Sequence, residues 1–151
     1  MRIILTTVKE ASVSINQKMV AKIPLGFLLL VGFTDGDNKD IVDKMVDKVI
    51  SLRVFPDEHL MINKSLQDVN GEILSVSQFT LYADTRKGRR PSFVNALNPH
   101  DAEPLYEYFN AQLSQKYRPV QAGVFGADMD VSSVNMGPFT IILDSEELFH
   151  E

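Results

Sequence analysis

The feature that most constrains the fold is an apolar run near the start of the chain. Residues 27–31 read Phe-Leu-Leu-Leu-Val and are flanked by Gly26 and Gly32. Five residues fall far short of the ~20 that are needed to span a bilayer. A short, near-continuous apolar run is typical of a strand that is buried on both faces. Residues 27–33 are therefore predicted to form an internal strand.

The remaining pattern predicts many strands and few helices. Alternation and turn signals indicate strands at 2–9, 11–15, 19–23, 53–55, 72–82, 119–125, 129–134 and 139–143. An apolar stripe predicts a helix at 40–52, and a second helix is expected to begin with Asn98 as N-cap and Pro99 at the first position. The predicted fold is a single α/β domain over residues 1–151. Two packed mixed β-sheets with helices on one outer face would make three layers, α/β/β.

Composition excludes several kinds of chemistry. The chain has no cysteine, which excludes a disulfide framework, a thiolate nucleophile and a cysteine-ligated metal. It contains no G-x-S-x-G elbow, no phosphate-binding G-x-x-x-x-G-K-[ST] loop and no metal-binding histidine motif. The three histidines, His59, His100 and His150, are far apart in sequence and are expected to be exposed. The start of the chain does not read as a signal peptide, so we expect a soluble, cytoplasmic protein.

The charge distribution is uneven. The net charge of −5, from 15 basic and 20 acidic residues, is weak evidence against a nucleic-acid partner. Four cations, however, fall within five residues: Arg86, Lys87, Arg89 and Arg90. Without them the chain has 11 basic and 20 acidic residues, a net charge of −9. Arginine favours bidentate phosphate contacts, so this segment is either a phosphate site or a solvated loop paired with acidic neighbours.

Two further segments can be explained either by a functional role or by structure alone. In a strand over residues 72–82, Ser77, Phe79 and Leu81 would share one face, with Gln78 and Thr80 on the other. These polar groups suit a site, but a strand with one wet face is the plainer explanation. Within residues 123–129, Gly126 and Ala127 would let a ligand approach the backbone closely, and an apolar surface could hold a base. Within residues 135–140, Gly137 and Pro138 interrupt an expected strand. A hairpin turn between two strands is the plainer explanation.

Taken together, four motifs resemble the D-aminoacyl-tRNA deacylase family. They are Ser-Gln-x-x-Leu at 77–81, Asn-x-Gly-Pro-x-Thr at 135–140, Arg-Lys-Gly-Arg-Arg-Pro at 86–91 and Phe-Gly-Ala-Asp-Met at 125–129. Each motif is weak alone, but the four in this order cover nearly the whole chain. The resemblance implies a cytosolic homodimer, with its active sites at the subunit interface. Such an enzyme would hydrolyse the ester between a D-amino acid and tRNA, clear glycine mis-attached to tRNA for alanine, and need no metal or cofactor.

The resemblance also assigns roles to residues. The catalytic segment would be Ser77, Gln78, Phe79 and Thr80, with help from the 2′-hydroxyl of the terminal ribose. Gly137 and Pro138, joined by a cis peptide, would enter the partner's pocket and reject L-amino acids. Phe125, Gly126, Ala127 and Met129 would hold the terminal adenosine, and Arg86, Lys87, Arg89 and Arg90 would contact tRNA phosphates.

The chain departs from the family pattern near its start. Relatives usually have Gln-Arg before a valine, where this chain has Thr6, Thr7 and Val8. In relatives that arginine is thought to brace the Gly-Pro dipeptide. Phe139 is also bulkier than the more usual valine.

Two other functions would also be compatible with this sequence. One is a non-catalytic protein that binds a tRNA end or a nucleotide, and the other is an unrelated small-molecule hydrolase with the same pocket.

Overall fold

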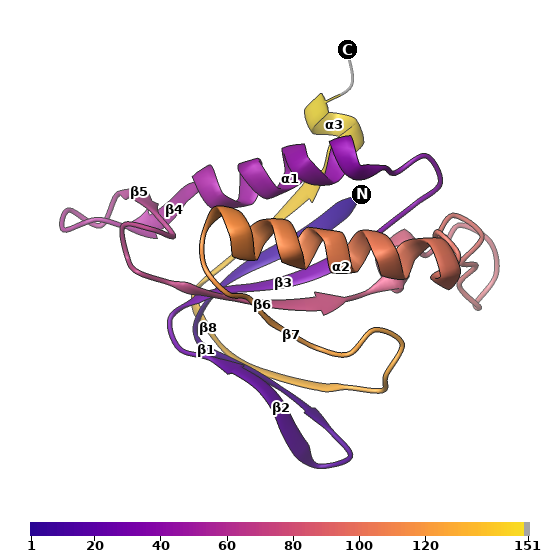
Figure 1. Cartoon of the computed structure of the whole chain (residues 1–151), viewed down its shortest axis with the longest axis horizontal. Helices are drawn as coiled ribbons and strands as arrows, with labels where there is room; N and C mark the ends of the chain where they lie inside the picture. The colour runs from indigo at the N-terminus through magenta and orange to yellow at the C-terminus, as the bar shows by residue number, and fades with distance from the viewer. Residues whose placement is uncertain (150–151) are drawn as a thin grey trace.

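A computed structural model describes residues 1–149. The elements in chain order are β1 (Arg2–Ile15), β2 (Lys18–Ile23), β3 (Gly26–Gly32), α1 (Lys39–Ser51), β4 (Arg53–Pro56), β5 (Ile62–Ser65), β6 (Glu72–Ser77), the 3-10 helix η1 (Phe79–Tyr82), α2 (Pro99–Lys116), β7 (Gln121–Ala122), β8 (Asp130–Asp144) and α3 (Ser145–Phe149). Figure 1 shows α1 and α2 side by side on one face of the sheet, and they also contact each other. None of the helices described is long and apolar enough to cross a bilayer.

The long strand β1 organises both β layers. Its first half pairs with β3 and its second half with β2, while β8 pairs with its other edge. The register against β8 shifts between Thr6 and Val8 and again between Val8 and Glu10. Such bulges bend a strand and increase its twist. The sheet therefore folds over, bringing β2 into contact with β6 and β7 (Figure 1).

Two apolar cores separate the three layers. One lies between the sheet and the helices and includes Ile3, Leu5 and Phe27, whereas the other lies inside the fold of the sheet and includes Val13 and Leu74. The strand β3 supplies both cores, since Phe27, Leu29 and Val31 face the helices and Leu28 faces the inner core. The predicted α/β/β class and the predicted internal strand are confirmed, and the two β layers prove to be halves of one hydrogen-bonded sheet. A separate pair, β4 and β5, forms a small second sheet.

Both predicted helices form for local reasons. The helix α1 buries Val42, Met45, Val46 and Val49 on one stripe. The helix α2 begins as predicted: the Asn98 side chain accepts a hydrogen bond from the Asp101 N–H at 3.0 Å, and Pro99 occupies the first turn.

Several predicted strand boundaries are wrong. The strand predicted over 72–82 ends at Ser77, because the last pairing bond runs from the Gln78 N–H to the Val31 carbonyl. The chain then turns into η1, so Phe79 and Leu81 do not share a strand face with Ser77. The strand predicted over 119–125 shrinks to two residues, and the strand β5 was not predicted at all.

The prediction of the last two strands is also wrong. Residues 129–134 and 139–143 do not form two separate strands, since β8 runs without a break from Asp130 to Asp144. It stays continuous because β1 pairs with it on both sides of the Gly137–Pro138 dipeptide. The peptide bond between these two residues is cis, as the resemblance implies.

Candidate active site

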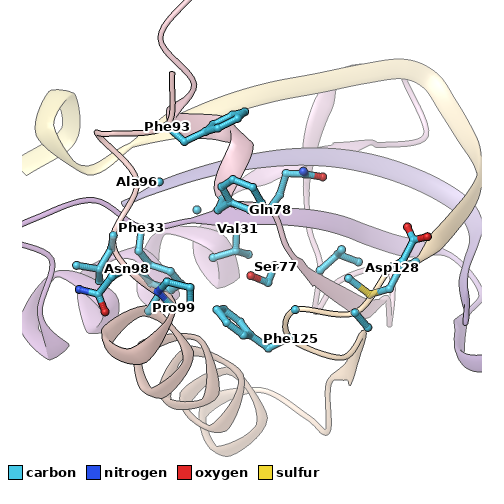
Figure 2. A pocket seen from close by; sticks show the side chains of 18 of the residues that line it. Val31, Phe33, Ser77, Gln78, Phe93, Ala96, Asn98, Pro99, Phe125 and Asp128 are labelled. Atoms are coloured by element: carbon cyan, nitrogen blue, oxygen red, sulfur yellow. The ribbon is translucent and has the colours of Figure 1, made fainter. Parts of the chain in front are cut away.

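A cleft of about 580 Å³ opens between the end of β6, the start of α2 and the loop before β8. Ser77, Gln78 and Phe79 line one part of it, and residues 125–129 line another. The structure thus brings together two segments that were singled out separately in the sequence. Figure 2 shows Ser77 and Phe125 facing the same space, with Phe93 at the rim. A volume in this range suits a small ligand or one nucleoside.

The polar segment after β6 is held in a defined shape. The Gln78 backbone N–H donates to the Val31 carbonyl at 2.8 Å, which fixes the point where the chain leaves the sheet. The Gln78 side-chain amide donates to the Thr80 hydroxyl at 2.5 Å. Thr80 itself is exposed and lies outside the residues that line the cleft. Ser77 and Phe79 are therefore cleft residues, while Thr80 belongs to its rim.

The opposite wall is tied to the same strand. The Gly123 N–H and the Tyr106 hydroxyl both donate to the Ser75 carbonyl, at 3.0 and 2.8 Å. Tyr106 is buried, which raises the pKa of its hydroxyl, and its ring lies 6.0 Å from that of Phe125. Gly126 has φ of +78°, a conformation that L side chains rarely adopt, and an added Cβ there would meet open space. The loop can therefore bring its backbone close to a bound ligand.

Several cleft residues were not predicted to belong to the site. Asn98 was predicted only as a helix cap, but it also lines the cleft, together with Phe33 and Phe93. Phe93 packs edge-on against Phe79 with ring centroids 5.1 Å apart. These residues come from distant segments, so no local sequence signal pointed to them.

The cleft is almost uncharged. Asp128 is the one ionisable residue among the described residues that line it. His59 and His100 are exposed as expected and lie outside the lining, while His150 lies outside the described residues. Within residues 1–149 no group of three or more potential metal ligands comes together.

The Gly137–Pro138 dipeptide is not part of this cleft within one chain. Both residues are exposed on β8, while their neighbours Met136 and Phe139 are half-buried against the helix-side core. Gly137 has φ of +117°, which an L side chain rarely adopts. The backbone of this dipeptide is therefore presented outward from the sheet.

The basic segment forms an exposed loop whose ends are pinned together. Asp84 and Ser92 exchange two backbone hydrogen bonds at its base. The Arg86 guanidinium donates two hydrogen bonds to the Asp84 carboxylate, at 2.9 and 2.7 Å, and with the Arg86 backbone N–H holds the pKa of Asp84 at about 2. Among the described residues, Lys87, Arg89 and Arg90 make no ion pair. The loop thus contains one paired cation and three unpaired ones.

The groups in the cleft can act only on a substrate that is already reactive. Neutral hydroxyl, amide and backbone groups can orient water and stabilise an oxyanion, but they supply no charged acid–base pair. A cleft of this kind, beside a basic loop on an α/β/β domain, suits the hydrolysis of an ester that is already reactive.

Comparison with known proteins identifies the family. The sequence model described as D-Tyr-tRNA(Tyr) deacylase matches residues 4–144. Curated D-aminoacyl-tRNA deacylases of Lactobacillus gasseri and Exiguobacterium sibiricum are each 54% identical over 144 residues, covering 95% of this chain and 99% of theirs. The chain belongs to the D-Tyr-tRNA(Tyr) deacylase family and is an ester hydrolase.

Solved structures agree on the fold. A structure of the c-Myc DNA Unwinding Element Binding Protein has a TM-score of 0.90 and 39% identity, and the match covers 95% of this chain and 98% of that one. A probable eukaryotic D-amino acid tRNA deacylase matches with a TM-score of 0.80 at 20% identity, covering 94% and 97% of the two chains. At that identity the second match speaks for the fold alone.

Proposed function

We propose that the protein hydrolyses the ester that joins a D-amino acid to the 3′ end of tRNA, and that it also removes glycine mis-attached to tRNA for alanine. The observation that carries the proposal is the meeting of two segments in one almost uncharged cleft. Ser77 and Phe79 offer polar groups to an ester, and Phe125 and Met129 offer an apolar surface to a base. The family to which the chain belongs supports the same assignment.

In this proposal the terminal adenosine occupies the cleft. Its base lies against Phe125 and Met129, and Gly126 and Ala127 allow the loop backbone to approach it closely. Stacking of a base on an aromatic ring contributes ~1–3 kcal/mol. The ribose and its ester then lie toward Ser77 and Phe79, on the other wall of the cleft.

The chemical step needs little from side chains, because an aminoacyl ester is already reactive. Backbone N–H groups of Phe79 and Thr80, at the start of η1, would hold the developing oxyanion. The 2′-hydroxyl of the terminal ribose assists the attacking water, and Thr80 positions the substrate. General-base help typically contributes a factor of ~10²–10⁴. A Thr80→Val variant whose activity falls by more than this range would show that Thr80 takes part in the chemistry instead.

Selection against L-amino acids is assigned to Gly137 and Pro138 of a second copy of the chain. The dipeptide is exposed and lies outside its own cleft, so a homodimer with sites at the subunit interface would place it in the partner's cleft. Its backbone carbonyls would hold the α-amino group and leave no room for an L side chain. A D side chain points elsewhere, and glycine has none to exclude.

The decisive experiment compares three substrates side by side. We expect the purified protein to deacylate D-tyrosyl-tRNA and glycyl-tRNA while sparing L-tyrosyl-tRNA. Equal rates with and without the protein would favour a non-catalytic protein that binds tRNA ends. Sedimentation tests the dimer, and a monomer that still spares the L substrate would contradict a filter supplied by a partner. The proposal includes a cytoplasmic location for the protein.

A further inference from the structure

Thr7 lies directly opposite the Gly137–Pro138 dipeptide. The pairing of β1 with β8 runs in register up to Thr6 and Thr140 and resumes at Val8 and Asn135. The intervening residues 136–139 of β8 therefore face the single residue Thr7. Bulged residues leave the ladder of backbone hydrogen bonds, so something else must fix their position.

The Thr7 side chain supplies that connection. Its hydroxyl donates to the Met136 carbonyl at 2.9 Å, and the residue is only 1% exposed. Met136 immediately precedes the dipeptide. A partly buried hydrogen bond between the paired strand β1 and this carbonyl limits how far the bulge can shift.

The neighbouring Thr6 makes a superficially similar contact. Its hydroxyl lies 3.1 Å from the hydroxyl of Thr140. These two residues, however, are directly opposite each other in the ladder, whose backbone pairing already fixes their position. Loss of the Thr6 hydroxyl therefore removes one hydrogen bond without freeing the bulge, which makes it a matched control.

We propose that Thr7 is a positioning residue for substrate selection. Its hydroxyl holds the Met136 carbonyl, and so determines where the backbone of Gly137 and Pro138 stands and how strictly L-aminoacyl esters are rejected. The inference rests on the proposed function, in which this dipeptide is the filter. A filter that works by steric exclusion is sensitive to small displacements, whereas the cleft that holds the adenosine does not depend on them.

The test compares Thr7→Val, which keeps the volume but removes the hydroxyl, with Thr7→Ser, which keeps the hydroxyl. The matched control is Thr6→Val. We measure kcat/KM on D-tyrosyl-, L-tyrosyl- and glycyl-tRNA, and thermal unfolding for every variant. Thr7→Val is expected to raise the L-to-D ratio of kcat/KM roughly two- to tenfold, the range for one neutral hydrogen bond. Glycyl-tRNA hydrolysis should not change, because glycine has no side chain to exclude.

The ratio should remain at the wild-type value in Thr7→Ser and Thr6→Val. An unchanged ratio in Thr7→Val would overturn the proposal, and so would an equal change in Thr6→Val. If the wild type does not deacylate D-tyrosyl-tRNA, the proposed function itself fails. The positioning step then has its own readout in the amide NMR shift of Gly137, which should move in Thr7→Val and not in Thr6→Val. An unmoved shift would refute it independently.

Discussion

The sharpest test of the basic loop is the salt dependence of tRNA binding. All four cations are exposed, but Arg86 is held by the Asp84 carboxylate through two hydrogen bonds, whereas Lys87, Arg89 and Arg90 make no ion pair with a described residue. The latter three can contact phosphates without first leaving a carboxylate partner. The relevant perturbation is therefore the triple substitution of Lys87, Arg89 and Arg90 by alanine.

The magnitude follows from counting charges. Each neutralised phosphate contributes about 0.9 to the slope of log K against log salt on a duplex and about 0.7 on a single strand. Three contacts thus account for a slope of roughly 2 to 3. Between 50 and 200 mM salt, the affinity of the wild type should fall roughly 20- to 40-fold more than that of the triple variant.

The assay is equilibrium binding of uncharged tRNA, which separates the loop from the chemical step. Asp84→Asn is the matched control, since it releases Arg86 and should make the slope steeper by roughly 0.7–0.9. The pKa of Asp84 is held at about 2, well below its usual 3.8, so the carboxylate stays charged and the pair persists until the pH falls toward 2. The wild-type slope should thus be constant from pH 5 to 8. Coinciding slopes for the wild type and the triple variant would remove the loop from tRNA binding.

Three other substitutions test the cleft and the fold. Phe125→Ala should raise KM roughly five- to hundredfold, because it removes a stacking surface. Steady-state kinetics measure this, with Phe125→Leu as the control, and an unchanged KM in Phe125→Ala would contradict the adenosine site. Gly26→Ala should destabilise the protein by about 4 kcal/mol or more, measured by urea unfolding, because its Cβ would lie 1.8 Å from the Glu72 carbonyl oxygen. Asn98→Ala should cost about 1 kcal/mol in the same assay by removing the cap on the Asp101 N–H; an unchanged midpoint would show that the cap is dispensable.

The sequence predicted best those features that depend on local contacts. Asn98 and Pro99 specify a helix start through bonds that span three residues, and the structure begins α2 there. The apolar run at 27–33 predicted burial on both faces because its composition alone requires two apolar surroundings. The two segments that line the cleft, 77–79 and 125–129, were likewise visible in the sequence, since each is contiguous.

The features that the sequence could not predict depend on distant partners. The alternation of residues 72–82 continues past Ser77, but the strand ends there because β3 ends at Gly32 and offers no further partner. A proline in a strand normally signals an interruption. Here β8 continues past Pro138 because β1 is long enough to pair on both sides of the bulge. Phe93 likewise joins the cleft through tertiary contacts alone.

Under the proposed function, the charge distribution explains how tRNA binding and substrate selection can be separated in one small protein. The described cleft offers one carboxylate and otherwise neutral groups, while the unpaired cations of the basic segment lie on a loop outside it. Phosphate contacts on the loop weaken as salt rises, because counterion release drives them. Steric exclusion by a backbone dipeptide carries no such dependence. In this proposal, salt acts on how tightly tRNA is held, while the choice between D and L substrates depends on packing around the dipeptide, where the Thr7 hydroxyl holds the Met136 carbonyl.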